Sequence, residues 1–428
     1  MSPGASPAAS PGASPAAKPQ ASPAAGQPSP AAGQASPVAQ AQAPASGEPT
    51  KLGIVTPLSP PGDASAGQLI MRGAQLGAEY VNSRQGGIIR SSCNLPGPIQ
   101  LVEADDSGTP EKGIAAFRKV AQDDRVAGVA GQFHSSVTLA MAPVADQLRV
   151  PLFSTQSSDV KITADHHPFV FQTHTITSDR ATAVAEFIKA SGFKKVAMVG
   201  ESTDYGTGNI DALQQALQGA SGVETRDWTF DNRSTDISPL LLQVKAFGPD
   251  LIYNLGVGAP AYLMVTQAYE TGLLPSTPML ISYDLPIRPE FWQNLGDKGK
   301  GIVFVVYYHP QEKLTDAGTW MQTEYQRRFN EPALYSSFAA FGNVLELAQA
   351  INQACSTEGQ TIARTLETGS FTTWNLTGVN FPPAEGADYH RIKQPLLLLQ
   401  YTQPNQDYAR APIVYPPNMK TADVQKNP

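Results

Sequence analysis

Two polar turns hold the residue types best suited to bind a small charged ligand. The first is Gly131-Gln-Phe-His-Ser-Ser-Val-Thr-Leu, where an apolar strand should end at Gly131 and a helix should begin just after Ser135 and Ser136. Hydroxyls and free amides at a helix N-terminus suit a carboxylate or another anion, because the helix dipole is positive at that end. Ordinary capping of the helix is the alternative interpretation.

The second polar turn follows the next apolar segment of the chain. Phe153-Ser-Thr-Gln-Ser-Ser-Asp places Gln156 and Ser158 at the end of a strand at 151–155. Ligands of parallel sheets bind at the carboxyl ends of the strands. Both turns are therefore candidates for a ligand site.

The sequence carries little sign of catalytic or metal chemistry. Its six histidines include no HExxH pattern, and it has neither a G-x-S-x-G turn nor a Walker A loop. Residues 256–261 fit the dinucleotide pattern G-x-G-x-x-A after a strand, but no acid stands about 20 residues further on. Pro260 also removes an amide at the helix start. We interpret these residues as a tight turn, and we expect no cofactor and no metal.

The elements that must position the two turns alternate between strand and helix. The predicted strands lie at 52–58, 99–105, 126–131, 151–155, 169–173, 196–200, 224–230, 251–256, 278–282 and 301–308. Segments with helical spacing separate most of them, which is typical of right-handed βαβ units on parallel sheets. The sequence therefore predicts an α/β fold with two sheets and a change of domain at 173–178.

The last third of the chain departs from this alternation. Residues 317–330, 336–355 and 360–368 have helical spacing, and a strand candidate at 396–401 follows a loop-rich stretch. A chain that begins a second sheet and then adds helices is expected to return to its first domain. Several crossings of this kind would form a hinge with a cleft between two lobes.

Composition excludes several classes of protein. The net charge is −7 and there is no basic cluster, which argues against binding to nucleic acid. No run of 18 apolar residues occurs, so the sequence predicts no membrane span.

Residues 1–50 differ from the rest, since 40 of them are Ala, Pro, Ser or Gly. So few bulky apolar side chains cannot offset the entropy of ordering, and we expect a disordered, semi-stiff linker that tethers the globular part to a surface. A low-complexity extension without that role is the alternative. The chain starts without the basic and apolar regions of a signal peptide, and a lipid-anchored cysteine ahead of residue 1 stays open.

The order of these segments resembles type I periplasmic binding proteins, and most of all the branched-chain amino acid-binding (Leu/Ile/Val-type) components of ABC transporters. The segments that carry the resemblance are KLGIVTPLS (51–59), LVEADDSGTPEKGIAAFRKV (101–120), GQFHSSVTLAMAPVADQLRVPLFSTQSSD (131–159) and DYGTGN (204–209). The resemblance extends from about Lys51 to Tyr401. It implies two Rossmann-like lobes, joined by a three-crossover hinge, that close on a small ligand and have no enzymatic activity.

The resemblance also implies roles for single residues. In amino-acid binders of this type, a hydroxyl at the first helix N-terminus takes the ligand carboxylate, and Ser135 matches that position, with Ser136 beside it. The turn after the next strand supplies further contacts, which correspond to Gln156 and Ser158. Gln156 departs from the family, where Ala stands at this position.

A family tyrosine matches Tyr205, and the acid that holds the ligand ammonium matches Asp284, where the family commonly has Glu. A capping or turn role is the alternative for Asp284. Rings that often wall the pocket are replaced by small residues near Ala66 and Gly258. An amino acid is therefore the favoured ligand, while short amides, urea and aromatic acids stay open. The aromatic residues nearest the strand ends, which we interpret as core residues, are Phe133, Tyr253, Tyr283 and Tyr307.

The family topology predicts lobe 1 at 51–174 and 306–378, and lobe 2 at 175–305 and 379–428. The expected partners are a small-molecule ligand and the membrane permease of an ABC importer. We expect a monomer outside the cytoplasm, in the periplasm or at the cell surface.

Two other functions stay open. One is an oxidoreductase of the NAD type that uses the turn at Gly256, and the missing acid argues against it. The other is a ligand-sensing receptor domain, which the lack of a membrane-spanning or DNA-binding segment disfavours. A disulfide between the two cysteines, Cys93 and Cys355, is compatible with a location outside the cytoplasm.

Overall fold

Two large sheets organise the protein, whose computed structural model describes residues 49–84, 97–219 and 222–426. Within these residues the first sheet has five parallel strands in the order β2-β1-β3-β4-β5. Its strands are β1 (Thr50–Thr56), β2 (Ile99–Asp105), β3 (Val129–Gln132), β4 (Leu152–Ser154) and β5 (Val170–Gln172). The first lobe is built on this sheet.

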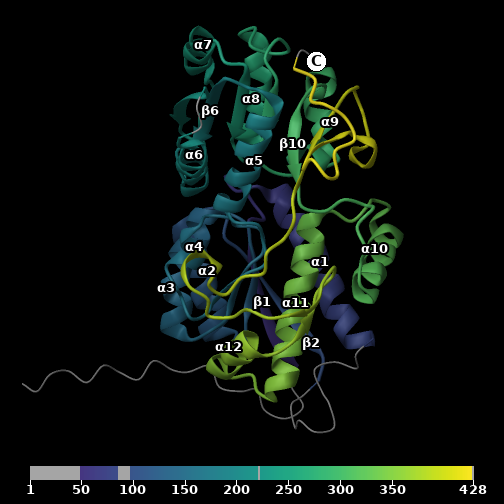
Figure 1. The fold of residues 1–428 in the computed structure, drawn as a ribbon. Coiled ribbons are helices and arrows are strands. Elements are labelled where there is room, and N and C mark those ends of the chain that lie inside the picture. Colours follow the sequence, from purple (N-terminus) through teal and green to yellow (C-terminus); the bar gives the residue numbers. More distant parts are fainter. Residues whose placement is uncertain (1–48, 85–96, 220–221, 427–428) are drawn as a thin grey trace, which may run out of the picture. The chain divides into compact units, whose positions relative to one another are not determined.

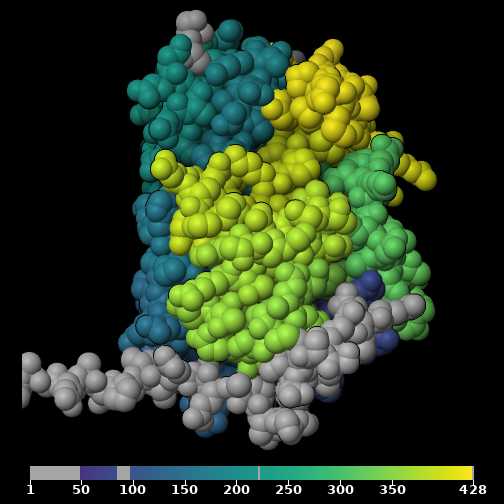
Figure 2. Space-filling model, turned by 60° about the horizontal axis from the view of Figure 1, so that its bottom comes forward, coloured from purple at the N-terminus to yellow at the C-terminus, as the bar shows by residue number. Residues whose placement is uncertain are grey.

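The helices of the first lobe come from distant parts of the sequence. They are α1 (Ala64–Arg84), α2 (Pro110–Arg118) with the π-helical turn Lys119–Asp123, α3 (Ser135–Leu148), α4 (Lys161–Ala164), α10 (Asp316–Phe329), α11 (Tyr335–Ala354) and α12 (Gly359–Thr368). Helix α11 lies alongside α1 (Figure 1), where Ser337 Oγ donates to the carbonyl oxygen of Leu69 (2.8 Å). Figure 2 shows the yellow-green residues after α11 directly against the blue residues of the first lobe. Helix α11 therefore packs on the helix that follows β1, far from it in the sequence.

The second lobe is built on a mixed sheet. Within the described residues this sheet has seven strands in the order β14-β13-β10-β9-β8-β6-β7, of which β13 and β14 run antiparallel to their neighbours. The strands are β6 (Lys195–Glu201), β7 (Glu224–Phe230), β8 (Leu251–Leu255), β9 (Met279–Ile281), β10 (Val303–Val306), β13 (Leu397–Gln400) and β14 (Ile413–Tyr415). The helices are α5 (Thr177–Ser191), α6 (Asp204–Leu217), α7 (Ser238–Phe247), α8 (Ala259–Glu270) and α9 (Glu290–Leu295). A short hairpin of β11 (Phe371–Thr372) and β12 (Thr377–Val379) stands apart from both sheets.

Short segments connect the two lobes. Within the described residues the chain crosses between β5 and α5, between β10 and α10, and between Arg391 and β13. The first and third crossings lie together, because Thr175 Oγ1 donates to the carbonyl oxygen of Gln394 (3.1 Å). After β14 the chain stays beside that strand, where the Thr421 amide donates to the carbonyl oxygen of Ile413 (2.8 Å). This arrangement confirms the α/β fold with a three-crossover hinge.

Some of the sequence-based expectations are not tested by the residues that the structure describes. The assignment of 51–174 with 306–378 and of 175–305 with 379–428 to separate lobes stays a prediction. Most of the expected linker at 1–50 and Cys93 lie outside the described residues. Cys355, at the end of α11, is disulfide-bonded. In the described part of the chain, no helix has the length and apolar character needed to cross a membrane.

Candidate ligand-binding site

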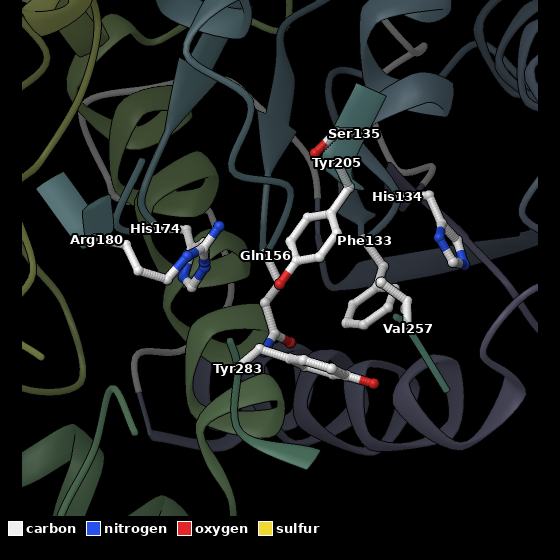
Figure 3. Close-up of a pocket in the computed structure, with 9 residues that line it drawn as sticks. All are labelled: Phe133, His134, Ser135, Gln156, His174, Arg180, Tyr205, Val257 and Tyr283. Atoms are coloured by element: carbon white, nitrogen blue, oxygen red, sulfur yellow. The ribbon is translucent and has the colours of Figure 1, made fainter. Parts of the chain in front are cut away.

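A pocket lies between the two lobes, at the carboxyl ends of strands from both sheets (Figure 3). The space between the atoms at this pocket, open solvent included, measures about 330 Å³. The described residues that line it are Phe133, His134, Ser135, Gln156, His174, Arg180, Tyr205, Val257 and Tyr283. In Figure 3, Arg180 and His174 lie on one side, Phe133 and Val257 on the other, and Gln156 and the Tyr205 ring between them.

Arg180 is the most unusual residue of this pocket. It lies in the first turn of α5 and is 0% exposed. Its Nε and Nη2 donate to Asn209 Oδ1 (3.1 and 2.8 Å), Nη1 donates to Tyr307 Oη (2.7 Å), and Nη2 donates to Ser158 Oγ (2.9 Å). These partners, in the described part of the chain, are all uncharged. A guanidinium group keeps its proton in proteins, so the pocket wall carries a buried positive charge.

The histidines of the pocket wall are neutral. Burial lowers the pKa of His134 to about 4, although Asp63 partly opposes this shift. Burial, and to a lesser extent Arg180, lowers the pKa of His174 well below its usual value. Both rings are therefore uncharged near neutral pH, which leaves Arg180 as the charged side chain among the described lining residues.

Three of the residues predicted from the sequence line the pocket. Ser135 Oγ accepts hydrogen bonds from the backbone amides of Ser158 (3.3 Å) and Asp159 (3.2 Å). The hydroxyls of Tyr205 and Ser282 share a hydrogen bond of 2.6 Å. Gln156 is the third of these residues. The two polar turns therefore meet at one site.

Two predicted serines contact the pocket indirectly. Ser136 Oγ accepts a hydrogen bond from the backbone amide of Asp204 in the second lobe (3.3 Å), so it joins the lobes. Ser158 Oγ accepts from Arg180, so it positions the guanidinium group. Neither serine is among the described lining residues.

Asp284 lies behind Gln156 and does not line the pocket. It is 1% exposed, and its Oδ1 accepts a hydrogen bond from Gln156 Nε2 (3.0 Å), which joins the lobes. The other end of the Gln156 amide, Oε1, accepts from Ser336 Oγ (2.6 Å). Burial raises the pKa of Asp284, although Arg288 partly opposes the shift.

The fold and the pocket together agree with a comparison to protein families. The family model described as "Periplasmic binding protein" matches residues 49–407. The chain belongs to this family.

Similar proteins agree with this assignment. The Leu/Ile/Val-binding protein homolog 3 of Brucella melitensis is 23% identical over 320 residues, which cover 74% of this chain and 83% of the relative. The substrate-binding protein LivJ from Streptococcus pneumoniae, solved with isoleucine, has a TM-score of 0.72 at 20% identity and covers 86% of this chain and 100% of its own. A solute-binding protein of an ABC transporter from R. palustris, solved with benzoate, has a TM-score of 0.70 at 19% identity, with coverages of 86% and 98%.

Membership of the periplasmic binding protein family confirms the resemblance inferred from the sequence. The expectation that the protein is not an enzyme agrees with this membership. The turn at Gly256 is thus not a dinucleotide site of an oxidoreductase.

Arg180 of this periplasmic binding protein was not predicted from the sequence. A signal was present, because Arg180 is followed by Val184 and Phe187 at helical spacing and so lies on the apolar face of its helix. An arginine on such a face is buried, and a buried arginine needs a partner. Phe133 and Tyr283, which we interpreted as core residues, also line the pocket.

Proposed function

We propose that this periplasmic binding protein is the substrate-binding component of an ABC importer, works outside the cytoplasm and closes its lobes on a small organic carboxylate. The observation that supports this proposal is the fully buried Arg180, whose described partners are neutral. A membrane permease would receive the ligand.

A buried charge without a counter-charge is costly, because it has lost its hydration. A ligand carboxylate would supply the missing negative charge and would accept charge-assisted hydrogen bonds from the guanidinium group. The N-terminus of α3 at Ser135 adds partial positive charge on the same pocket. Both features favour an anion over a neutral sugar or urea.

An amino acid belongs to this ligand class and is the ligand favoured by the sequence. In that arrangement its carboxylate would lie at Ser135 and Ser158, and its ammonium group at Asp284 and Tyr205. The names of the Brucella relative and the isoleucine complex of the S. pneumoniae protein support it. The benzoate complex of the R. palustris protein supports an aromatic acid instead.

The test compares each carboxylate with its amide, which lacks the negative charge. Isothermal titration calorimetry would use the pairs leucine and leucinamide, and benzoate and benzamide, together with urea. We expect at least one acid to bind and its amide to bind at least about 100-fold more weakly, which corresponds to about 2.7 kcal/mol. Equal binding of an acid and its amide, or binding of urea alone, would contradict the proposal.

A variant without the Arg180 charge then tests whether the ligand carboxylate binds at this residue. Arg180→Met should weaken binding of the acid by about 100-fold or more, because the loss of a buried charge partner costs several kcal/mol. The matched control is Arg226→Met on the exposed side of β7, which should bind as the parent protein does. Circular dichroism checks that both variants are folded.

A further inference from the structure

The pocket wall offers aromatic rings where an ammonium group would need an acid. Five of its described residues carry rings, namely Phe133, His134, His174, Tyr205 and Tyr283, and Val257 adds an apolar side chain. None of the described lining residues is an aspartate or a glutamate. An amino acid would therefore meet the wall with its ammonium group unpaired.

The nearest predicted acid, Asp284, is covered by a neutral amide. Gln156 lines the pocket and Asp284 does not, and the two are joined by the hydrogen bond from Nε2 to Oδ1. Gln156 is held on its other side by Ser336 in α11. To reach Asp284, a ligand ammonium group would have to break both hydrogen bonds and displace the Gln156 side chain. Gln156, which departs from the family pattern, thus keeps a ligand ammonium group away from Asp284.

A second acid, Glu201, lies close to Val257, and both of its carboxylate oxygens already accept hydrogen bonds. Glu201 Oε1 accepts a hydrogen bond from Thr203 Oγ1 (2.8 Å), and Oε2 accepts from the backbone amide of Val257 (3.1 Å). Glu201 is itself buried, and burial raises its pKa to about 7. Both oxygens of this carboxyl group already accept hydrogen bonds, and with a pKa of about 7 it is only partly ionised at neutral pH.

The rings suit a flat, apolar ligand body. Tyr205 and Tyr283 lie with ring centroids 6.4 Å apart at 75°, and the Phe133 ring lies beside them (Figure 3). Aromatic contacts of this kind stabilise a bound ring beyond the burial of its area. An ammonium group buried without a partner would instead oppose binding strongly, because it loses its hydration.

We propose that the ligand is an aromatic monocarboxylate without an amino group, with its carboxylate on Arg180 and its ring among Phe133, Tyr205 and Tyr283. This inference rests on the proposed function, because it takes over the carboxylate contact at Arg180. It narrows the ligand class to acids of the benzoate and phenylacetate type.

The decisive experiment varies the amino group alone. Phenylacetate and phenylglycine differ only in that group, as do 4-methylpentanoate and leucine. By calorimetry we expect phenylacetate to bind at least about 100-fold more tightly than either enantiomer of phenylglycine, and benzoate to bind at least about 10-fold more tightly than 4-methylpentanoate. Tighter or equal binding of the amino acid in either pair, or of 4-methylpentanoate relative to benzoate, would overturn the inference.

A variant that uncovers Asp284 adds a second readout. Gln156→Ala should move the ratio of phenylglycine to phenylacetate affinity toward the amino acid by about 10-fold or more, because the carboxylate becomes accessible. The matched control is Gln214→Ala on the exposed face of α6, which should keep the ratio of the parent protein. An unchanged ratio in Gln156→Ala would overturn the role given to the amide.

The two proposals fail in different ways. If amino acids bind more tightly than their desamino analogues, and Arg180→Met weakens both, the further inference is wrong and the proposed function stands. If amides bind as tightly as acids, or if no acid binds, the proposed function is wrong and the inference falls with it.

Discussion

Asp63 Oδ2 and Arg288 Nη1 lie 2.7 Å apart and form an ion pair that joins the two lobes across the cleft. The pair is buried, since the side chains of Arg288 and Asp63 are 1% and 5% exposed. Burial opposes the charge of Asp63, but Arg288 outweighs it and lowers the pKa of Asp63. One partner comes from each lobe, so an opening of the cleft would separate the two charges and hydrate both.

Substitution of Asp63 should therefore weaken ligand binding by favouring the open form. Asp63→Asn removes the ion-pair partner of the buried Arg288 in the closed form only, and such a loss costs about 3–5 kcal/mol when it is complete. Asparagine still caps α1, where Asp63 Oδ1 now accepts from the Ala66 amide (3.1 Å). We expect the Kd to rise by about 10- to 100-fold, measured by calorimetry.

Small-angle X-ray scattering provides the structural readout for the same variant. Asp63→Asn should have a larger radius of gyration than the parent protein in the same buffer. The control is Asp124→Asn, which removes a partly exposed ion pair with Lys119 inside the first lobe. An unchanged Kd together with an unchanged radius would show that this ion pair does not control closure.

Glu346 makes the stability of the first lobe depend on pH. It is buried in α11, where Oε2 accepts a hydrogen bond from Asn343 Nδ2 (3.1 Å). Burial raises the pKa of Glu346 to about 8, although Asn343 partly opposes the shift. Because the folded protein keeps a proton that the unfolded chain releases near pH 4.5, the stabilising contribution is complete below that pH and is lost as the pH rises to about 8.

Glu346→Gln should remove this dependence. Relative to the parent protein, the variant should gain about 1.4 kcal/mol in the free energy of unfolding for each pH unit between about 4.5 and 8. Denaturant unfolding at pH 5, 6.5 and 8 measures the difference. Glu270→Gln, at an exposed position in α8, is the control. A constant difference between variant and parent at all three pH values would contradict the prediction.

The sequence predicted elements well where local pattern decides them. The strand predictions at 99–105 and 224–230 coincide with β2 and β7. It missed β14, a short strand between Pro412 and Pro416, because prolines normally indicate a turn. In the structure β14 forms the edge of its sheet, the place where flanking prolines are tolerated. Helices α4 and α9 were missed because four and six residues are too few for helical periodicity.

In the candidate site, too, some residues could be predicted from local sequence patterns and others could not. The turns that hold Ser135 and Gln156 could be found because they follow predicted strands of a parallel sheet. The contact between Gln156 and Asp284 could not, because the two residues come from different lobes and meet only when the hinge brings them together. Arg180 depends likewise on Tyr307 of another crossing, which no local pattern indicates.

Gly73 allows α1 and α11 to approach each other closely. A Cβ atom at this position would lie 2.0 Å from the carbonyl oxygen of Ser337, so the two helices would have to move apart. Gly73→Ala should therefore lower the free energy of unfolding by about 1–3 kcal/mol, although alanine favours a helix over glycine by about 1 kcal/mol. Thermal unfolding would measure the loss against the exposed control Gln75→Ala. A melting temperature equal to or above that of the parent protein would contradict this packing argument.

Asn209 offers a test of the charge on Arg180 that leaves Arg180 in place. Asn209 Oδ1 accepts from both Nε and Nη2 of the guanidinium group, and Nδ2 donates to the carbonyl oxygen of Tyr205 (2.6 Å). Asn209→Asp would place a carboxylate of nearly the same shape beside Arg180 and would neutralise it. A ligand carboxylate would then meet a like charge, and we expect its Kd to rise by about 100-fold or more.

The same variant should affect an uncharged ligand much less. Benzamide affinity should therefore change by less than about 10-fold when benzoate affinity falls by about 100-fold, because only the acid feels the added negative charge. Calorimetry with both compounds separates this electrostatic effect from a general distortion of the pocket, which would weaken both equally. Asn418→Asp, at an exposed position near the C-terminus, controls for the change in net charge. If Asn209→Asp binds benzoate as the parent protein does, Arg180 does not hold the ligand carboxylate.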